Sequence, residues 1–518
     1  MYPAVTLGTS RSIFLLEAEF GPLFRTKLAC MSSNSDQSSF DRRSFLRWSG
    51  AAISASWLGT RAWARPQTEA KDLPQHLDFR RPPEQVYDAV IIGGGLSGLT
   101  AASALNQLGN HRVKVLEVRD RVGGRTLNAA TAGGGVVELG GQWVGPTQDA
   151  VLNLMASLNI DRFPTYNIGA PVNDTSETLN AVELLDYWQA IQRIDQMAQT
   201  VPLNNPWDAA QASQWDAMTV QDWMNANMAT DAAKSLIDFT VQVDFGGPAR
   251  RVSLLWFLFY VHSGTNFNTM SEKAQRWRVV GGTQVISLEL ANRLGQQVEL
   301  NAEVEGILWD DRGALIHFGG GRLIGAKKVI VAMMPKDADR IRFFPNLPSD
   351  RANLQKLWST GQGDKYFAVY NTPFWRQQGR NGIAYSDNQF IVLAWDNSPP
   401  SGSPGILGGF PILEGSNRPP TKALRRRLVL RSFADFFGPE AYNAIDYHEY
   451  SWGLDPLTEG CVTPLEPGLL TAFGPALRQP VGPIHWAGTE SSTVWCGYLD
   501  GAVRAGERAA QEVHALLP

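Results

Sequence analysis

The chain has 518 residues, of which 44% are hydrophobic and 19% are charged, so it is long enough for two or three globular domains. Its net charge of −4 gives no reason to expect a nucleic acid or an anionic membrane as a partner. Its seven histidines are scattered and no C-x-x-C occurs, so no metal site is expected. The densest basic run, Arg425-Arg426-Arg427, is typical of a solvated helix face.

The first 64 residues have the features of a bacterial twin-arginine export signal. Arg42-Arg43 precede a short, mildly apolar stretch, and Ala62-Trp63-Ala64 has the A-x-A pattern of a cleavage site. The apolar stretch is too short and too rich in Ser and Gly for a permanent membrane span. We therefore predict a signal region at 1–64, of which 1–30 is either not translated or disordered, and a linker at 65–85. The mature protein is expected in the periplasm or outside the cell, without a membrane span.

The strongest local pattern begins after this linker. An apolar run at Val86–Ile92 predicts a buried parallel strand. It is followed, in G-x-G-x-x-G spacing, by Gly93, Gly95 and Gly98, and then by the helical stretch LSGLTAASALNQL. The three glycines allow a tight turn, a close approach of a pyrophosphate, and close packing of the helix on the strand. A second strand, HRVKVLEV, ends at Glu117, near the spacing of a ribose-binding carboxylate, so an ADP-containing dinucleotide is expected.

Further along, motifs in a fixed order resemble those of the flavin-dependent monoamine oxidase family. In chain order they are IIGGGLSGL, LEVRDRVGGRT, ELGGQWVGPTQ, WRVVGGTQ, TPFWR, EGC, LRQPVGPIHWAGTE and GYLDGAVRAGERAA. They cover nearly all of 86–518. The resemblance implies FAD as cofactor and an α/β fold, in which an FAD-binding, Rossmann-like dinucleotide domain is interleaved with an α+β substrate domain of mixed sheet and helices.

The family-like boundaries divide each domain into discontinuous pieces. They place the FAD-binding domain at 86–162, 280–354 and 455–518, and the substrate-binding domain at 163–279 and 355–454. Matched position by position, the resemblance assigns cofactor binding to the following residues: Gly93, Gly95, Gly98, Glu117, Arg119, Arg125, Gly141, Val304, Cys461, Gly488, Glu490, Tyr498 and Leu499.

Three residues match catalytic positions of the family. Lys365, the only cation in the strand-like stretch KYFAVY, matches the lysine that holds a water against flavin N5, where a cation would favour electron transfer to dioxygen. An exposed lysine at a strand end is the alternative interpretation. Trp452 lies nine residues before Cys461, as does the family tryptophan that packs beside the flavin. Tyr498 matches one wall of the aromatic cage that guides the amine.

The chain departs from the family at the opposing wall of that cage. Monoamine oxidases have a tyrosine directly after the cysteine, and this chain has Val462 there. Amine oxidation remains the expected reaction, but the identity of the substrate is less well defined. In the family, the apolar helical stretch that corresponds to RVSLLWFLFYVHSGTNFNTMS leads into the loop that lines the substrate cavity, so the resemblance makes Phe267 and Asn268, near the end of this stretch, candidate cavity residues. Gln275 matches a polar residue of the cavity, with an ordinary strand-end glutamine as the alternative.

Cys461 matches the family cysteine that forms a thioether with the 8α-methyl group of the flavin, so covalently attached FAD is expected. Two alternatives remain open. Related enzymes of the same fold bind FAD without a covalent bond, and a disulfide between Cys461 and Cys496 is conceivable in an oxidising compartment.

The resemblance implies oxidation of an amine to an imine, which is hydrolysed to an aldehyde or ketone, with dioxygen reduced to hydrogen peroxide. No acidic track for a polyamine is evident in the linear sequence, so an aryl-alkyl or aliphatic monoamine is favoured. The alternatives are a dehydrogenase that passes electrons to a periplasmic c-type cytochrome, an L-amino-acid oxidase and a non-catalytic flavoprotein. GGQWVGPTQDAVLNL has no arginine to clamp a substrate carboxylate, which disfavours the amino-acid oxidase. A homodimer is expected.

Overall fold

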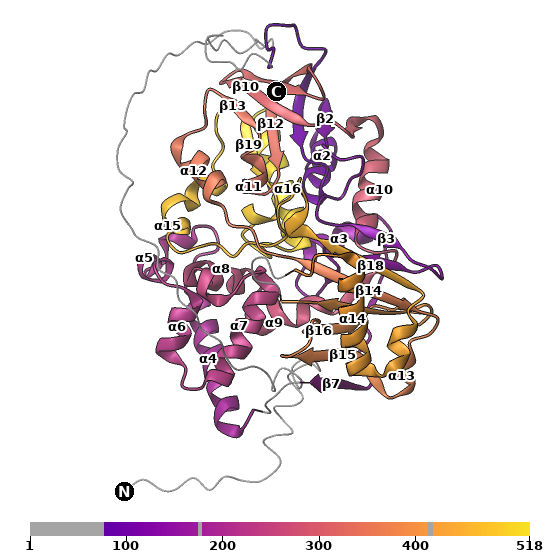
Figure 1. Ribbon diagram of the computed structural model, residues 1–518. Helices are drawn as coiled ribbons and strands as arrows, with labels where there is room; N and C mark the ends of the chain where they lie inside the picture. Colours follow the sequence, from indigo (N-terminus) through magenta and orange to yellow (C-terminus); the bar gives the residue numbers. More distant parts are fainter. Residues whose placement is uncertain (1–76, 175–178, 413–417, 518) are drawn as a thin grey trace, which may run out of the picture.

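The computed structural model describes residues 77–174, 179–412 and 418–517. Figure 1 shows one sheet in the half of the molecule that contains the C-terminus, a second sheet in the other half, and a group of helices beside the second sheet. The predicted mixed α/β fold is confirmed. The predicted export signal at 1–64 lies outside the described residues. Within the described ranges, no helix is long and apolar enough to cross a membrane.

The first sheet is built around the strand predicted before the glycines. Its strand order is β13-β10-β11-β12-β1-β2-β9, and β19 pairs with the end of β12. Alternate residues of β1 face two different cores: Ala89 and Ile91 face one, and Val90 and Ile92 face the other. Both faces of the sheet are therefore covered, which explains why β1 is apolar at successive positions. The strand bounds are β1 Val86–Ile92, β2 Val113–Leu116, β9 Val298–Glu299, β10 Val304–Asp310, β11 Gly313–Phe318, β12 Arg322–Ala332, β13 Arg342–Phe344 and β19 Ile484–Ala487.

Two long helices pack against each other on one face of this sheet, α2 and α16. The packing of α2 depends on Gly98. A Cβ at this position would lie 2.0 Å from the carbonyl oxygen of Gly93 and 3.2 Å from the Cβ of Ala332. The third glycine of the motif is therefore required by close helix–strand contact, as predicted from the sequence. The helices around this sheet are α2 Leu96–Leu108, α3 Asp149–Ser157, α10 Gln284–Leu294, α11 Pro335–Ala338 and α16 Leu499–His514.

The second sheet has the strand order β18-β14-β17-β16-β15-β7. All seven residues of β14 are buried. Helix α14 covers one face of this sheet, where Val429 and Phe433 pack against residues of β14 and β17. The predicted solvated face of α14 is wrong at Arg425, which is 7% exposed because its guanidinium pairs with the Glu449 carboxylate at 2.5 Å. The bounds are β7 Ala170–Asp174, β14 Asp364–Tyr370, β15 Arg380–Ser386, β16 Leu393–Asp396, β17 Gly405–Phe410, β18 Asp446–Ser451, α13 Phe374–Gln377 and α14 Lys422–Phe437.

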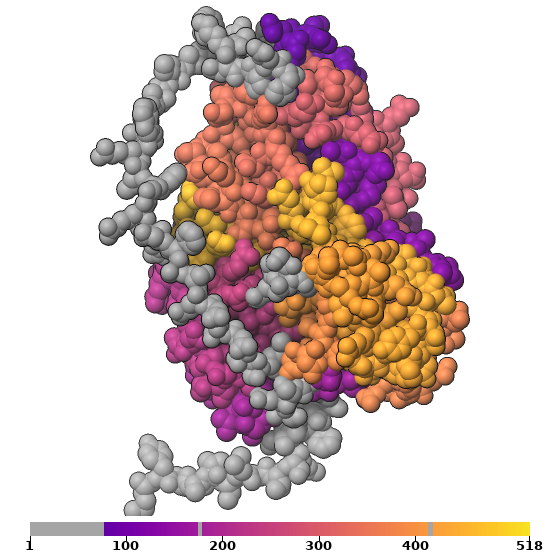
Figure 2. Space-filling view, in the orientation of Figure 1, coloured from indigo at the N-terminus to yellow at the C-terminus, as the bar shows by residue number. Residues whose placement is uncertain are grey.

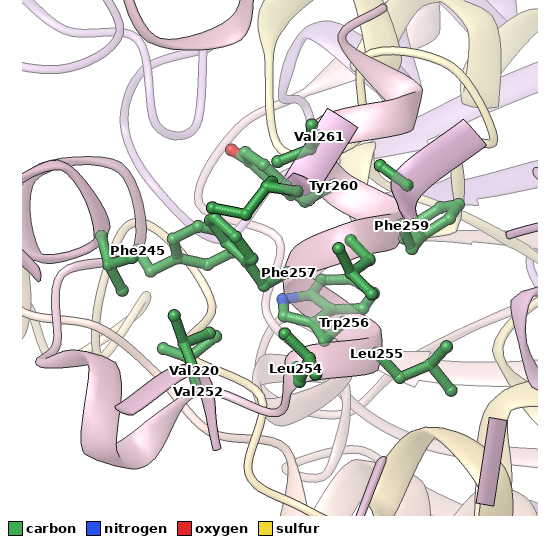
Figure 3. Packing of buried hydrophobic residues seen from close by; sticks show 14 of the residues in the cluster. Val220, Phe245, Val252, Leu254, Leu255, Trp256, Phe257, Phe259, Tyr260 and Val261 are labelled. Atoms are coloured by element: carbon green, nitrogen blue, oxygen red, sulfur yellow. The ribbon is translucent and has the colours of Figure 1, made fainter. Parts of the chain in front are cut away.

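The group of helices encloses the largest apolar core, which Figure 3 shows around α8. In Figure 2 the magenta surface of these helices lies beside the orange surface of the second sheet. The apolar stretch predicted as one helix is divided: α8 ends at Ser263, Thr265 has a φ of 84°, and the Asn266 side chain accepts a hydrogen bond from the Thr269 N–H and so begins α9. The bounds are α4 Ala181–Gln199, α5 Ala212–Asp216, α6 Val220–Asn227, α7 Asp231–Phe245, α8 Leu254–Ser263, α9 Phe267–Ser271, α12 Ser349–Leu357 and α15 Leu469–Phe473.

Two small sheets connect these layers. One pairs β3 with β4, and the other has the order β5-β8-β6. The bounds are β3 Asn128–Ala130, β4 Val136–Glu138, β5 Trp143–Val144, β6 Arg162–Pro164 and β8 Trp277–Val279.

Two segments make contacts that the predicted boundaries do not describe. The described end of the predicted linker packs against the first sheet: Leu77 and Phe79 are each 2% exposed and contact Leu308 and Leu315. In the segment 455–518, predicted for the FAD-binding domain, helix α15 packs against α5 and α12 in the core of the helical group. In both segments apolar side chains pack into a hydrophobic core. The boundaries taken from the sequence did not take this packing into account.

The contact at Gly98 generates a stability prediction. A Gly→Ala change inside a helix ordinarily stabilises it by about 1 kcal/mol. We expect Gly98→Ala to destabilise the protein by about 3 kcal/mol instead, because the new methyl group overlaps a backbone oxygen. Thermal unfolding of the holoprotein checks this, with a fall in melting temperature of about 5 °C or more expected. Gln107→Ala, at an exposed site of the same helix, is the control and should change little. An unchanged or raised melting temperature for Gly98→Ala would contradict the packing argument.

Candidate active site

A single cavity of about 990 Å³ extends between the two sheets and the group of helices. The predicted site residues that line it are Gly93, Gly95, Glu117, Arg119, Arg125, Gly141, Gln275, Val304, Lys365, Trp452, Cys461, Val462, Gly488, Tyr498 and Leu499. The predicted site residues that do not line it are Gly98, Phe267, Asn268 and Glu490. Segments far apart in the sequence therefore meet at one cavity.

The dinucleotide end of the cavity is formed by the glycine turn and the start of α2. Gly93 has a φ of +104°, and a Cβ there would lie 2.8 Å from the Ala332 carbonyl oxygen. The first turn of α2 has no side-chain cap, so its N–H groups are available to an anion in the cavity. Glu117 is 5% exposed, and its carboxylate accepts hydrogen bonds from the N–H groups of Gly94 at 2.6 Å and Arg119 at 2.9 Å. This arrangement fits the pyrophosphate and ribose of a dinucleotide.

Two arginines project into the cavity beyond this turn, and acidic partners hold each of them. Arg119 donates to the Asp455 carboxylate at 2.7 Å. Arg125 donates to the Glu490 carboxylate at 2.6 Å and to the Cys461 carbonyl at 3.0 Å. Although burial disfavours the charge of Arg125, the Glu490 carboxylate raises its pKa. Glu490 thus positions Arg125 from behind the cavity wall, and Glu490 itself does not line the cavity.

Lys365 is buried, so the interpretation as an exposed strand-end lysine is wrong. Its side chain is 7% exposed on β14. Its Nζ donates to the Gly140 carbonyl at 2.8 Å, to the Gln142 Oε1 at 2.8 Å and to the Glu138 carbonyl at 3.2 Å. Nζ also lies 5.0 Å from the centre of the Trp143 ring. Burial lowers the pKa of Lys365 to about 7, against the opposing effect of the Glu138 carboxylate. The charge of Lys365 is therefore expected to depend on pH near neutrality.

Cys461 and Trp452 lie close to Lys365. The Trp452 indole donates to the Leu139 carbonyl at 2.9 Å, which fixes the ring on the cavity wall. A Cβ at Gly363 would lie 2.3 Å from the Cys461 Sγ, so glycine is needed there to accommodate the thiol. Burial raises the pKa of the Cys461 thiol to about 11, although Arg125 and Lys365 oppose this.

Both described cysteines are free thiols, so the disulfide alternative is wrong in this structure. Cys461 lines the cavity, whereas Cys496 is fully buried and does not.

Tyr498 forms an aromatic wall together with two other rings. Its ring centre lies 4.8 Å from that of Trp495 and 5.7 Å from that of Tyr260, and its hydroxyl donates to the Met270 carbonyl at 3.1 Å. Val462 also lines the cavity, and a Cβ at Gly246 would lie 2.9 Å from the Val462 Cγ2. The second ring next to Tyr498 within the cavity wall is therefore Tyr260, from α8.

The predicted loop residues Phe267 and Asn268 lie outside the cavity lining. Phe267 is 1% exposed and packs in the helical core, and its N–H donates to the Asp195 carboxylate at 2.8 Å. The break before α9 turns this segment into the core, which explains the difference. Gln275 does line the cavity, and within the described residues its buried Oε1 has no hydrogen-bond partner.

Sequence reasoning missed several polar and aromatic residues of the cavity: Gln142, Trp143, Asp244, Tyr260 and Asp337. Gln142 and Trp143 stand inside the quoted motif ELGGQWVGPTQ, directly after the second glycine pair, and this position could have identified them. Asp244, Tyr260 and Asp337 lie on helices where no local motif marks them. Burial raises the pKa of Asp337, at the cofactor end, to about 7.

Comparisons with known proteins agree with this geometry. The family model for flavin containing amine oxidoreductase matches residues 96–514. AofH of Mycobacterium tuberculosis, named as a flavin-containing monoamine oxidase, is 39% identical over 449 residues, which cover 84% of this chain and 98% of AofH. Amine oxidase [flavin-containing] A of Sus scrofa is 33% identical over 453 residues, covering 83% of this chain and 85% of the relative.

Solved structures are similar over the same region. A wild-type putrescine oxidase bound to putrescine has a TM-score of 0.79 at 31% identity and covers 84% of this chain and 100% of its own. Cyclohexylamine oxidase from Brevibacterium oxydans has a TM-score of 0.77 at 31% identity and covers 83% of this chain and 99% of its own. The glycine turn, the buried Lys365 and the family match together show that the chain belongs to the flavin-containing amine oxidoreductases.

Proposed function

We propose that the protein oxidises an amine to an imine, which is hydrolysed to an aldehyde or ketone, and reduces dioxygen to hydrogen peroxide. One observation carries this proposal: the cavity that begins at the dinucleotide glycines continues to the buried Lys365 and the aromatic wall at Tyr498. The relatives support it, because those described above are named as oxidases of amines.

The residues present fit FAD as the cofactor. The uncapped start of α2 would suit the pyrophosphate, the Glu117 carboxylate would suit a ribose hydroxyl, and Arg125 would supply a fixed positive charge on the cavity wall for the anionic cofactor. When bound, the flavin supplies the redox chemistry, taking a hydride equivalent from the amine and passing electrons to dioxygen.

The chain's own residues orient the reactants and stabilise charge. Tyr498, held by its hydrogen bond to the Met270 carbonyl and by the Trp495 ring, provides a rigid surface for the amine. Lys365 supplies a cation in a site shielded from water. There its charge stabilises the negative charge that develops on dioxygen more strongly than it would in bulk water. The residues that line the cavity directly after the second glycine pair, Gln142 and Trp143, carry no guanidinium, so nothing at this position favours an amino acid with a free carboxylate.

The proposal is tested with the purified holoenzyme. Anaerobic addition of an amine should bleach the flavin absorbance, and admission of air should restore it with production of equimolar hydrogen peroxide. A flavin that none of a panel of primary, secondary and polyamines bleaches would contradict the proposal and favour the non-catalytic alternative. A flavin that is bleached, but reoxidised by a c-type cytochrome and not by air, would identify the dehydrogenase alternative.

Lys365→Met should slow reoxidation by dioxygen about a hundredfold, because the ammonium that stabilises the developing charge is removed. Anaerobic reduction by the amine should change much less. In the wild-type enzyme the reoxidation rate constant should fall as the pH rises through about 7, since the pKa of Lys365 is lowered to that value and the cation is lost above it. Stopped-flow absorbance measures both half-reactions. Equal slowing of the two half-reactions, or the same pH profile in the variant, would contradict this role.

Cys461 is proposed as the covalent attachment point of FAD, because its thiol faces the cavity next to Lys365 and Trp452. Acid precipitation should leave the yellow colour with the wild-type protein and release it from Cys461→Ala. Cys496→Ala is a matched control, since Cys496 is fully buried outside the cavity lining, and its colour should stay with the protein. Colour released from the wild-type protein would show that the cofactor is bound without a covalent bond.

A further inference from the structure

A carboxyl oxygen buried at the dinucleotide end of the cavity is left without a hydrogen-bond partner by the described residues. It is the Oδ1 of Asp337, a residue of α11 that lines the cavity and is 6% exposed. Two other carboxylates of this region are engaged, because Glu117 accepts hydrogen bonds from two backbone N–H groups and Glu490 pairs with Arg125 at 2.6 Å. Asp337 therefore presents a polar group that the described part of the protein does not satisfy.

The chain enters α11 between two glycines that line the cavity. A Cβ at Gly93 would lie 3.5 Å from the Met333 Cγ, and a Cβ at Gly488 would lie 2.8 Å from the Met333 carbonyl oxygen. Met333, just before the helix, and Asp337, in its first turn, both line the cavity. Asp337 is therefore at the end of the cavity where the glycine turn and the start of α2 would receive a pyrophosphate.

The arginines of this region are bound to other groups. Arg340, three residues after Asp337, donates to the Pro456 carbonyl and pairs with the Glu459 carboxylate at 2.5 Å. Arg125 is held by the acceptors described above. Neither guanidinium pairs with the Asp337 carboxylate, so its charge is not compensated by a direct contact with them.

A carboxyl group in this position favours its neutral form. Taking an unpaired charge out of water is unfavourable, so burial raises the pKa of Asp337 to about 7. Of the charged groups that face it, Arg125 and Arg340 lower this pKa, and Glu490 and Glu459 raise it. Near neutral pH a fraction of the molecules therefore carries Asp337 as the neutral acid, whose O–H is a hydrogen-bond donor.

A dinucleotide adds negative charge at the same end of the cavity. The phosphates would repel an ionised carboxylate there, whereas the neutral acid would donate a charge-assisted hydrogen bond to a phosphate oxygen. The alternative is a carboxylate that accepts a hydrogen bond from a hydroxyl group of the cofactor, which would keep two negative groups side by side. The neutral acid is therefore the form that suits a bound pyrophosphate.

We propose that Asp337 binds FAD as the neutral acid, with its O–H donating a hydrogen bond to an oxygen of the pyrophosphate. Where Asp337 is ionised in the apoprotein, FAD binding takes up a proton from the solvent, and the affinity for FAD falls as the pH rises above about 7. This inference rests on the cofactor part of the proposed function, and it does not depend on which amine is oxidised.

The test measures FAD binding by the full-length Cys461→Ala protein, in which Cys461 cannot form a thioether and the cofactor is exchangeable. Titration of the apoprotein with FAD, followed by flavin fluorescence, gives the dissociation constant from about pH 6 to about pH 9. This constant should change little below pH 7 and should rise up to about tenfold per pH unit above it. Calorimetry at about pH 8, in buffers of different ionisation enthalpy, should show the uptake of about one proton.

Asp337→Asn, made in the Cys461→Ala parent, keeps a hydrogen-bond donor but has no charge. At about pH 9 it should bind FAD about tenfold or more tightly than the parent, a gain that damage to the fold would not produce. It should also take up about one proton fewer at about pH 8, and any contribution from Lys365 is common to both proteins. Asp339→Asn removes an exposed carboxylate two residues further on and is the matched control, which should keep the pH profile of the parent.

Asp337→Ala removes the donor as well, and it should bind FAD about tenfold more weakly than Asp337→Asn at each pH. Equal affinities of these two variants, or the same pH profile in the parent and Asp337→Asn, would overturn the proposal. So would an affinity that rises with pH, which would indicate a carboxylate accepting from a cofactor hydroxyl.

Thermal unfolding of the FAD-loaded proteins provides a second measurement that needs no apoprotein. A neutral buried acid must ionise on unfolding at high pH, so the parent should lose more melting temperature between about pH 6 and about pH 9 than Asp337→Asn does. An equal loss in both proteins would again contradict the proposal. No amine enters these measurements, so the amine-dependent bleaching of the flavin tests the proposed function separately.

Discussion

A lysine ammonium buried between the second sheet and the chain at the end of β4 sets the strictest requirement on this fold. Lys365 stands on β14 of the second sheet, but its three acceptors belong to the last residue of β4 and the segment that follows: the carbonyls of Glu138 and Gly140 and the side chain of Gln142. A buried ammonium without such partners would be unfavourable by several kcal/mol. The chain therefore has to leave the strand after Glu138 and turn these oxygens toward Lys365. That turn also brings the second glycine pair to the cavity wall.

A hydrogen-bonded network behind this turn determines how Gln142 is oriented. Its Nε2 donates to the Asn397 Oδ1 at 2.5 Å, which leaves its Oε1 to accept from Lys365. Asn397 donates in turn to the Glu138 carboxylate at 3.2 Å, and both oxygens of that carboxylate accept hydrogen bonds from the Nη2 of Arg278, at 2.8 and 3.0 Å. Because Glu138 is fully buried, its charge needs Arg278. The network joins β4, β8 and the residue after β16, so the geometry at Lys365 depends on both small sheets and on the second sheet.

The sequence predicted the parts of the site that local motifs encode. The strand before Gly93, the role of Gly98 and the carboxylate of Glu117 could be predicted because turn geometry and spacing fix them within a few dozen residues. The position of Lys365 in the cavity could be predicted because the resemblance supplied the register of its strand. Its burial and its three acceptors were not predictable, since the acceptors lie more than two hundred residues earlier in the chain.

The other cavity residues lie on helices, where no local motif identified them in the sequence. Asp244 and Asp337 look like ordinary polar positions at helix ends, and only the tertiary packing shows that they line a cavity. Arg425 was expected at a solvated face for the same reason, and its burial depends on Glu449 from another element. Phe267 was expected at the cavity because the resemblance assigned its segment to the cavity loop, but the helix α9 that Asn266 caps places its side chain in the core.

The departure at Val462 is linked to the residues around it. A Cβ at Gly246 would lie 2.9 Å from the Val462 Cγ2, and one at Gly361 would lie 3.0 Å from it, so the backbone closes tightly around this side chain. Asp244 lies only two residues before Gly246, at the end of the same helix. Val462 and the C-terminal end of α7 therefore form adjoining parts of the cavity lining, so the shape of the cavity at Val462 depends on how this helix ends.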